Sequence, residues 1–177
     1  MKTTYTITAF SENQIGLLNR ITIIFTRRQV NIETLTVSPS AIEGIHKFTI
    51  VVRETQEKVE KVVRQIEKLV EVLRAFYHPD EEIVFQEIAL YKVPTEALLA
   101  STELETIIRK HNARILEVMP EYTIIEKTGH EDETQDLFKH LKQFKVRQFT
   151  RSGRVAVTKL KKELLSDYLK IVDSRPA

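Results

Sequence analysis

Two asparagines and one glycine near the start of the chain are the residues whose types and spacing best suit ligand binding. Asn13 and Gly16 lie between a strand-like stretch and a helix-like stretch, and Asn31 lies where the next strand begins. The first N–H groups of a helix have no partner within the helix, so they can hold an anionic or zwitterionic ligand beside amide side chains. We expect the two asparagines to meet in one polar nest that binds a small molecule rather than catalyses a reaction.

Each of these residues also has a purely structural interpretation. Gly16 could be a turn glycine that is needed only for a positive φ. Asn13 could be an ordinary cap at the entrance of a helix. The functional interpretation is favoured because all three residues fall in one short run, in an order that places them around a single helix.

The residues needed for catalysis do not gather in the sequence. There is no cysteine, which excludes thiolate nucleophiles and disulfides, and no nucleophile elbow, P-loop or dinucleotide fingerprint is present. The five histidines fall in different elements without metal-ligand spacing, so solvated or hydrogen-bonded roles are expected for them. The acidic run 131–133 is read as a helix start, where carboxylates favour the dipole, with a metal site as the weaker alternative.

Composition points to a globular protein with ample material for a core and without a basic surface. The chain has 177 residues, of which 42% are hydrophobic and 29% charged, and its net charge is only +2. That balance does not favour nucleic-acid binding. No apolar run approaches the roughly 20 residues that span a bilayer, and the chain starts directly in a strand-like stretch without a signal peptide. We expect a cytoplasmic protein that binds neither nucleic acid nor membrane.

Hydrophobic periodicity predicts the order β-α-β-β-α-β twice. In the first half, period-2 and period-3.6 patterns alternate over residues 3–10, 17–28, 31–38, 45–52, 57–70 and 72–77. After a break at 79–82, strands are expected at 83–93, 113–119, 122–128 and 145–149, with helices after Pro94 and after Gly129.

The predicted fold class is therefore α+β, with two tandem ferredoxin-like domains at 1–78 and 83–177. Residues 160–172 have helical spacing and predict an amphipathic C-terminal helix. Each four-stranded sheet has exposed edges, so we expect the chain to form a homodimer through its first half.

Two other functions of this fold fit the residues less well. An acylphosphatase-like enzyme needs an arginine in its first loop to hold phosphate, and the loop 13–16 contains none. An RNA-recognition module displays stacking aromatic residues on its third strand, where this chain offers only Phe48.

Four stretches of the sequence, the first of which includes the loop 13–16, resemble one family. They are the run Glu12-Asn13-x-x-Gly16-x-Leu18-x-Arg20-x4-Phe25-x2-Arg28-x2-Asn31-Ile32-Glu33-x-Leu35-x-Val37, the stretch 69–73, the stretch 86–93, and 150–153. In these motifs the chain resembles the regulatory (small) subunit of acetolactate synthase, also called acetohydroxyacid synthase, whose N-terminal half is an ACT domain. The resemblance covers nearly the whole length.

The resemblance implies a non-catalytic chain that binds valine where two ACT domains pair. Asn13 and Asn31 match the family's polar contacts to the amino acid. The remaining expected effector-binding residues, which close over the ligand or line its site, are Ile15, Gly16, Leu17, Leu18 and Ile32. No catalytic residue and no metal site is expected on this chain.

The resemblance also implies a partner. The catalytic large subunit is expected to carry thiamine diphosphate, Mg²⁺ and FAD, whereas this chain is expected to carry no cofactor. The small subunit is expected to activate the large one and to make it sensitive to feedback inhibition in valine, leucine and isoleucine biosynthesis. The alternative is a free-standing ACT amino-acid sensor that regulates another enzyme.

Overall fold

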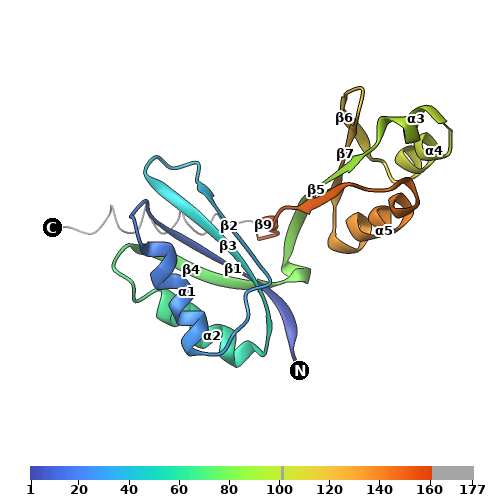
Figure 1. The fold of residues 1–177 in the computed structure, drawn as a ribbon. Helices are drawn as coiled ribbons and strands as arrows, with labels where there is room; N and C mark the ends of the chain where they lie inside the picture. The colour runs from blue at the N-terminus through green and yellow to red at the C-terminus, as the bar shows by residue number, and fades with distance from the viewer. Residues whose placement is uncertain (101, 161–177) are drawn as a thin grey trace. The chain divides into compact units, whose positions relative to one another are not determined.

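The structure, a computed structural model, describes residues 1–100 and 102–160 (Figure 1). Within this part the chain forms two compact units. One consists of Met1–Val84 with the residues that follow Val155, and the other is Phe85–Val155. Among the helices described, none is long and apolar enough to cross a membrane.

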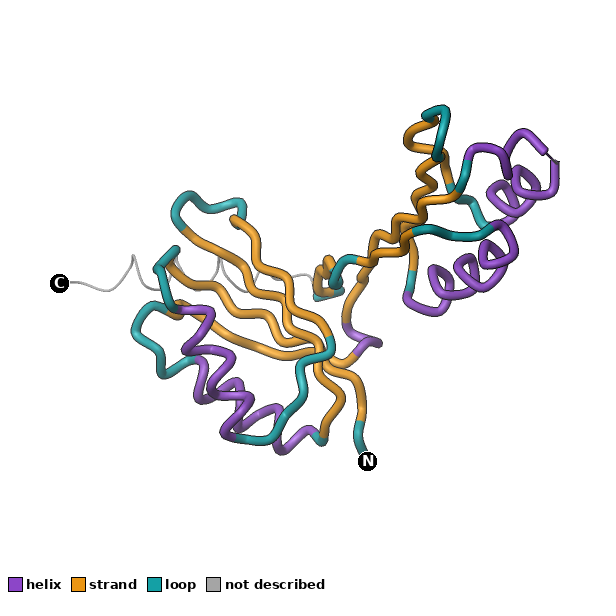
Figure 2. Tube along the Cα trace, in the orientation of Figure 1, coloured by secondary structure: helices purple, strands orange, loops and turns teal. Residues whose placement is uncertain are grey.

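The first unit is a four-stranded antiparallel sheet with two helices on one face (Figure 2). Its strands lie in the order β2-β3-β1-β4, so β2 and β4 are the edges. Its elements are β1 (Thr3–Glu12), α1 (Leu17–Arg27), β2 (Thr34–Pro39), β3 (Ile45–Glu54), α2 (Gln56–Ile66), β4 (Val72–Pro79) and a 3₁₀ turn η1 (Asp80–Glu82).

The helices of this unit are held by apolar stripes at helical spacing. In α1 the buried side chains are Leu17, Ile21 and Phe25, which recur every four residues and therefore share one face. They pack with the buried stripe of α2 on the central strands, where Ile7 and Ile50 are fully buried. Burial of this stripe fixes where α1 begins and ends, and so positions the loop before it.

A buried carboxylate closes the end of β3 and gives a testable pH dependence. Glu54 accepts hydrogen bonds from Lys2 Nζ at 2.8 Å, from Lys58 Nζ at 3.3 Å and from the N–H of Thr55 at 3.1 Å. These bonds, the one from Lys2 foremost, lower the pKa of Glu54 from 4.5 to about 2 although burial opposes the shift. Because its pKa is depressed in the folded state, Glu54 stabilises the fold fully above pH 4.5 and loses this effect as the pH falls toward 2.

We therefore expect Glu54→Gln to unfold at lower urea concentration than the wild type at pH 7. The difference between the two midpoints should shrink steadily as the pH is lowered to 3. Glu43→Gln, at an exposed position, is the control and should leave the midpoint almost unchanged at both pH values. A Glu54→Gln difference that is the same at pH 7 and pH 3 would contradict the assignment.

The second unit repeats the topology of the first. Its sheet has the order β6-β7-β5-β8, and β9 also pairs with β5. Its elements are β5 (Ile83–Val93), α3 (Thr95–Ala100), α4 (Thr102–Lys110), β6 (Arg114–Val118), β7 (Thr123–Gly129), α5 (Glu131–Leu141), a 3₁₀ turn η2 (Lys142–Phe144) and β8 (Gln148–Arg151). The strand β9 (Val155–Thr158) starts at the last residue of this unit, and its other residues belong to the first unit. The α+β class and the paired ferredoxin-like units are confirmed.

Several predicted bounds were wrong. Helices are observed after Pro94, as expected, in the described ranges on either side of residue 101. β8 begins at Gln148 rather than at residue 145, because η2 and a left-handed Lys145 (φ 55°) continue the turn. β2 begins at Thr34 rather than at residue 31, since a left-handed Gln29 (φ 52°) ends the α1 region.

The end of the described chain also differs from expectation. β9 was not predicted, and from Ala156 the chain belongs to the first unit, whereas the sequence assigned everything from residue 83 to the second domain. Two bonds hold this segment, from Lys47 Nζ to the carbonyl of Ala156 at 2.7 Å and from the N–H of Lys159 to the carbonyl of Glu82 at 2.9 Å. The helix expected at 160–172 lies almost wholly outside the described residues.

Candidate ligand-binding site

The loop before α1 ends on a glycine whose conformation opens the helix start. Gly16 is the N-cap, with φ 85° and ψ −8°, and no side chain caps the helix. The N–H of Leu17 is taken by the carbonyl of Gln14 at 3.2 Å. Within the described chain, the N–H groups of Leu18 and Asn19 donate to no backbone carbonyl. These two donors can face an anionic group.

Most of the predicted site residues are open to solvent. Asn13, Gly16 and Asn31 are exposed, and Ile15 is fully exposed. The side chain of Leu18 is also exposed, to 45%. An exposed isoleucine and leucine beside free helix N–H groups form an amphipathic surface of the kind that an amino acid with an apolar side chain requires.

Two predicted residues are less accessible. Leu17 is 1% exposed and belongs to the core of the first unit, so its side chain anchors the helix and does not face a ligand. Ile32 is half-buried and packs against the same core. Their contribution is to fix the positions of the neighbouring exposed residues.

The structure does not bring Asn13 and Asn31 together within one chain, so the expected nest is corrected. The N–H of Asn13 bonds to the carbonyl of Gly44 at 3.2 Å, and the N–H of Glu33 bonds to the carbonyl of Val51 at 2.8 Å. Gly44 directly precedes β3 and Val51 lies well along that strand, so the two carbonyls are roughly 20 Å apart at the usual rise of a strand. The 11 residues of α1 likewise separate the asparagines by about 16 Å.

An arginine braces the loop in a way that the sequence did not reveal. Arg20 donates to Gln14 Oε1 at 3.3 Å and pairs with Glu71 Oε1 at 2.6 Å. The bond from Arg20 is the largest cause that lowers the pKa of Glu71 below its ordinary value. Arg20 was part of the motif, but its partner lies far along the chain, so sequence spacing carried no signal for this contact.

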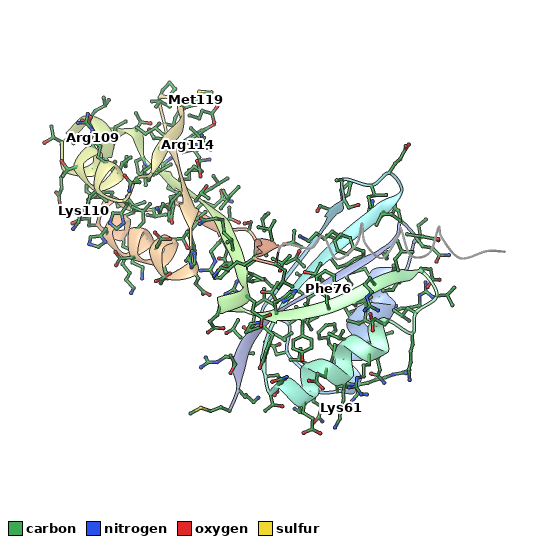
Figure 3. All side chains as sticks on the ribbon, turned by 180° about the vertical axis from the view of Figure 1, so that it is seen from behind. Lys61, Phe76, Arg109, Lys110, Arg114 and Met119 are labelled. Carbon is green, nitrogen blue, oxygen red and sulfur yellow. The ribbon has the colours of Figure 1, made fainter. Side chains whose placement is uncertain are left out.

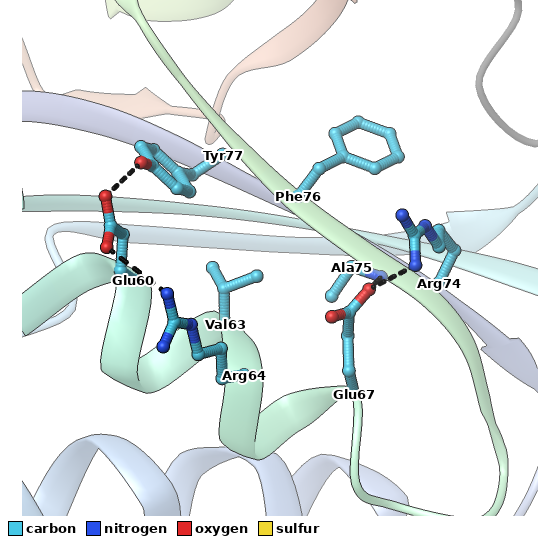
Figure 4. A pocket seen from close by; sticks show the side chains of 8 residues that line it. All are labelled: Glu60, Val63, Arg64, Glu67, Arg74, Ala75, Phe76 and Tyr77. Atoms are coloured by element: carbon cyan, nitrogen blue, oxygen red, sulfur yellow. Dashed lines mark hydrogen bonds and ion pairs between the residues drawn. The ribbon is translucent and has the colours of Figure 1, made fainter.

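A concave region of the first unit lies between α2 and β4 (Figure 4). It has a volume of about 350 Å³ and is lined by residues of α2 and β4, with the loop between them. Its charged groups pair with one another: Arg64 with Glu60 at 3.8 Å and Arg74 with Glu67 at 3.1 Å. Because these charges neutralise each other, the region is a weaker candidate for a zwitterion than the start of α1.

The motif stretches of the second unit meet around one buried acid. Glu87 is 2% exposed, and its carboxylate lies 3.2 Å from Arg151 Nε and 3.6 Å from Arg154 Nε. Burial raises the pKa of Glu87, while the two arginines act in the opposite direction. Ser152 bonds back to Ile88 through both its N–H and its Oγ. These contacts give residues 86–93 and 150–153 a structural role.

Comparison with known proteins gives matches along both units. A family model described as the AHAS small subunit-like ACT domain matches residues 7–74. A second model, described as the small subunit of acetolactate synthase, matches residues 86–160.

Individual relatives agree with these models. The chain is 33% identical to the acetolactate synthase small subunit of Bacillus subtilis, over 88% of this chain and 90% of that protein. It is 34% identical to a probable acetolactate synthase small subunit of Archaeoglobus fulgidus, over 88% and 96% of the two chains. The crystal structure of the acetolactate synthase small subunit from Thermotoga maritima superposes with a TM-score of 0.80 at 27% identity, and covers 90% of this chain and 99% of that one.

Proposed function

The chain belongs to the family of acetolactate synthase small subunits and carries its ACT domain, and from this premise we propose that it binds valine between two copies of itself. The matches confirm the resemblance that the motifs indicated. Because residues 86–160 match the small-subunit model as well, a free-standing ACT sensor is not favoured.

The observation that carries this proposal is the separation of Asn13 from Asn31. Both asparagines are exposed and flank α1, so a ligand that contacts both must lie between two chains. Neither end of α1 is a complete site alone. One end offers free N–H groups and apolar side chains, whereas the other offers a single amide.

Pairing along β2 would complete the site. β2 is an edge strand that follows α1, whereas the other edge, β4, follows α2 and packs against it. A two-fold axis beside β2 makes the two β2 strands antiparallel and sets the two α1 helices side by side in opposite directions. The start of each α1 then faces the end of the other. Val37 on β2 is 39% exposed and would be covered by this contact.

The chemistry of such a site suits valine. The N–H groups of Leu18 and Asn19 would donate to the carboxylate, with the positive end of the α1 dipole behind them. The amide oxygens of Asn13 and of the other chain's Asn31 would accept from the ammonium group. Asn31 Nδ2 already donates to Glu33 Oε1 at 3.1 Å, which orients its amide. Ile15 and Leu18 would cover the isopropyl group.

The regulated partner in this proposal is the catalytic large subunit of acetolactate synthase. In this proposal the large subunit performs the chemistry with thiamine diphosphate, Mg²⁺ and FAD, and this chain supplies no catalytic group. Valine favours one arrangement of the small-subunit dimer, and the large subunit is coupled to that arrangement. Without valine, the small subunit activates the large subunit. When valine is bound, the small subunit instead makes the large subunit subject to feedback inhibition.

Titration calorimetry on the isolated full chain tests the binding step. Valine should release or absorb heat and raise the melting temperature, while glycine, which has no apolar side chain, should do neither. Leucine and isoleucine should bind within about 10- to 200-fold of valine, the range expected for one methylene. Absence of both heat and thermal shift with all three branched-chain amino acids would refute the proposal.

A further inference from the structure

Three side chains of the second unit gather where α4 meets α5. His111 directly follows α4, whose last residues Arg109 and Lys110 are labelled in Figure 3. Asp136 and His140 stand one turn apart on α5, which packs against α4. Each of the three offers one ligand atom, and these atoms all lie within 4.8 Å of one another. Sequence spacing did not show this cluster, because α4 and α5 are brought together only by the fold.

One nitrogen of the cluster is buried without a partner. His111 Nε2 is inaccessible to solvent and makes no hydrogen bond within the described residues. The ring of His111 lies beside that of His140, with centroids 5.0 Å apart and planes at 52°. A buried ring nitrogen without a hydrogen-bond partner, on a ring that lies beside a second imidazole, calls for an explanation.

The bonding around His140 leaves a second nitrogen free. Its Nδ1 lies 2.9 Å from the carbonyl oxygen of Asp136, which can only accept, so the proton is on Nδ1 and the lone pair is on Nε2. A backbone carbonyl that fixes the tautomer in this way is a common outer contact of a metal-binding histidine. The carboxylate of Asp136 also stays close, with Oδ2 3.9 Å from His140 Nδ1.

Burial and nearby groups both act on the ring of His111. Burial and the neighbouring His140 lower the pKa of His111, with smaller contributions from Lys110 and Lys127, while Asp136 acts in the opposite direction. Lys127 is turned toward Glu133, at 3.9 Å, which partly offsets its repulsion of a cation.

We propose that His111, Asp136 and His140 bind a divalent transition-metal cation of the zinc class. Two imidazole nitrogens and one carboxylate oxygen match the ligands of Zn²⁺ and leave a fourth position for water. Mg²⁺ and Ca²⁺ prefer oxygen ligands and should not bind here. Metal–ligand bonds of about 2.1 Å require the three ligand atoms to move closer together. Asp136 and His140 are exposed and can rotate to achieve this.

A bound cation would tie the end of α4 to α5. Because the ion binds only when both helices are in place, it should stabilise the second unit against unfolding. The site is independent of valine binding, so its presence or absence can be tested separately.

The test uses the full chain without a histidine tag, freed of metal by chelation. Zn²⁺ calorimetry should show one site per chain, and Co²⁺ should give the strong visible absorption of a four-coordinate complex. His140→Gln and Asp136→Asn, at exposed positions, should each weaken Zn²⁺ binding by about 10-fold or more while the circular dichroism is unchanged. His46→Gln and Asp132→Asn are the matched controls and should bind as the wild type does.

Two results would overturn the proposal. One is a wild-type chain that binds neither Zn²⁺ nor Co²⁺ at a single site. The other is Zn²⁺ binding that survives unchanged in both His140→Gln and Asp136→Asn, which would place the ion elsewhere.

Discussion

Replacement of Gly16 by Asp is expected to abolish the response to valine. Gly16 is the N-cap of α1, and the space where a Cβ would stand is open, with no atom within 4 Å. An aspartate there would place its carboxylate beside the N–H groups that are proposed to hold the ligand's carboxylate. Two like charges about 4 Å apart repel by about 1 kcal/mol in water and about 4 kcal/mol in a partly buried site. Because the proposed site lies between two chains and is partly buried, valine affinity should fall by up to about 1000-fold.

Gly16→Asn is the matched control for this substitution. Asparagine has nearly the same size as aspartate and tolerates the left-handed conformation about equally, at a backbone cost of about 1–2 kcal/mol, but it carries no charge. Calorimetry should find that Asn weakens valine binding much less than Asp does. Equal losses would indicate a steric effect, and unchanged binding in Gly16→Asp would show that the ligand lies elsewhere.

An equal mixture of Asn13→Ala and Asn31→Ala chains is expected to regain valine binding that neither variant shows alone. Each substitution removes a hydrogen bond to a charged ligand, which is worth about 1.5–3 kcal/mol. In a mixed dimer, one of the two sites combines Asn13 of one chain with Asn31 of the other, and is intact. The second site lacks both asparagines.

The amount of recovered binding can be calculated. After unfolding and refolding together, about half of the dimers should be mixed, and each should hold one valine instead of two. The mixture should thus bind about one quarter as much valine as the wild type, with wild-type affinity. If both asparagines contacted the same ligand within one chain, mixing would recover no binding at all.

Much of the fold could be predicted because its signals are local. The spacing of Leu17, Ile21 and Phe25 predicts α1 whatever the rest of the chain does. Strict alternation of apolar and polar residues likewise predicts the strands. The misplaced bounds arise where backbone conformation decides, as at Gln29 and Lys145, which are left-handed without being glycine. β9 is too short for a periodic signal, and it forms only because it can pair with β5.

The site was predictable in residue types but not in geometry. Asn13, Gly16 and Ile15 are exposed around the helix start, as a binding loop requires. Their relation to Asn31 depends on the length of α1 and on the register of β3, which a list of motif residues does not contain. The brace from Arg20 to Glu71 joins segments that are distant in the sequence, so it too could be found only in three dimensions.

The central claim is that this chain reports valine to an active site on another subunit. The most direct test is to measure acetolactate formation by the purified large subunit, alone and with this chain, across a range of valine concentrations. The wild-type chain should raise the rate, and valine should lower it. The Gly16→Asp chain should raise the rate equally but leave it unaffected by valine. A rate that does not change when this chain is added, or valine inhibition that persists with Gly16→Asp, would contradict the account.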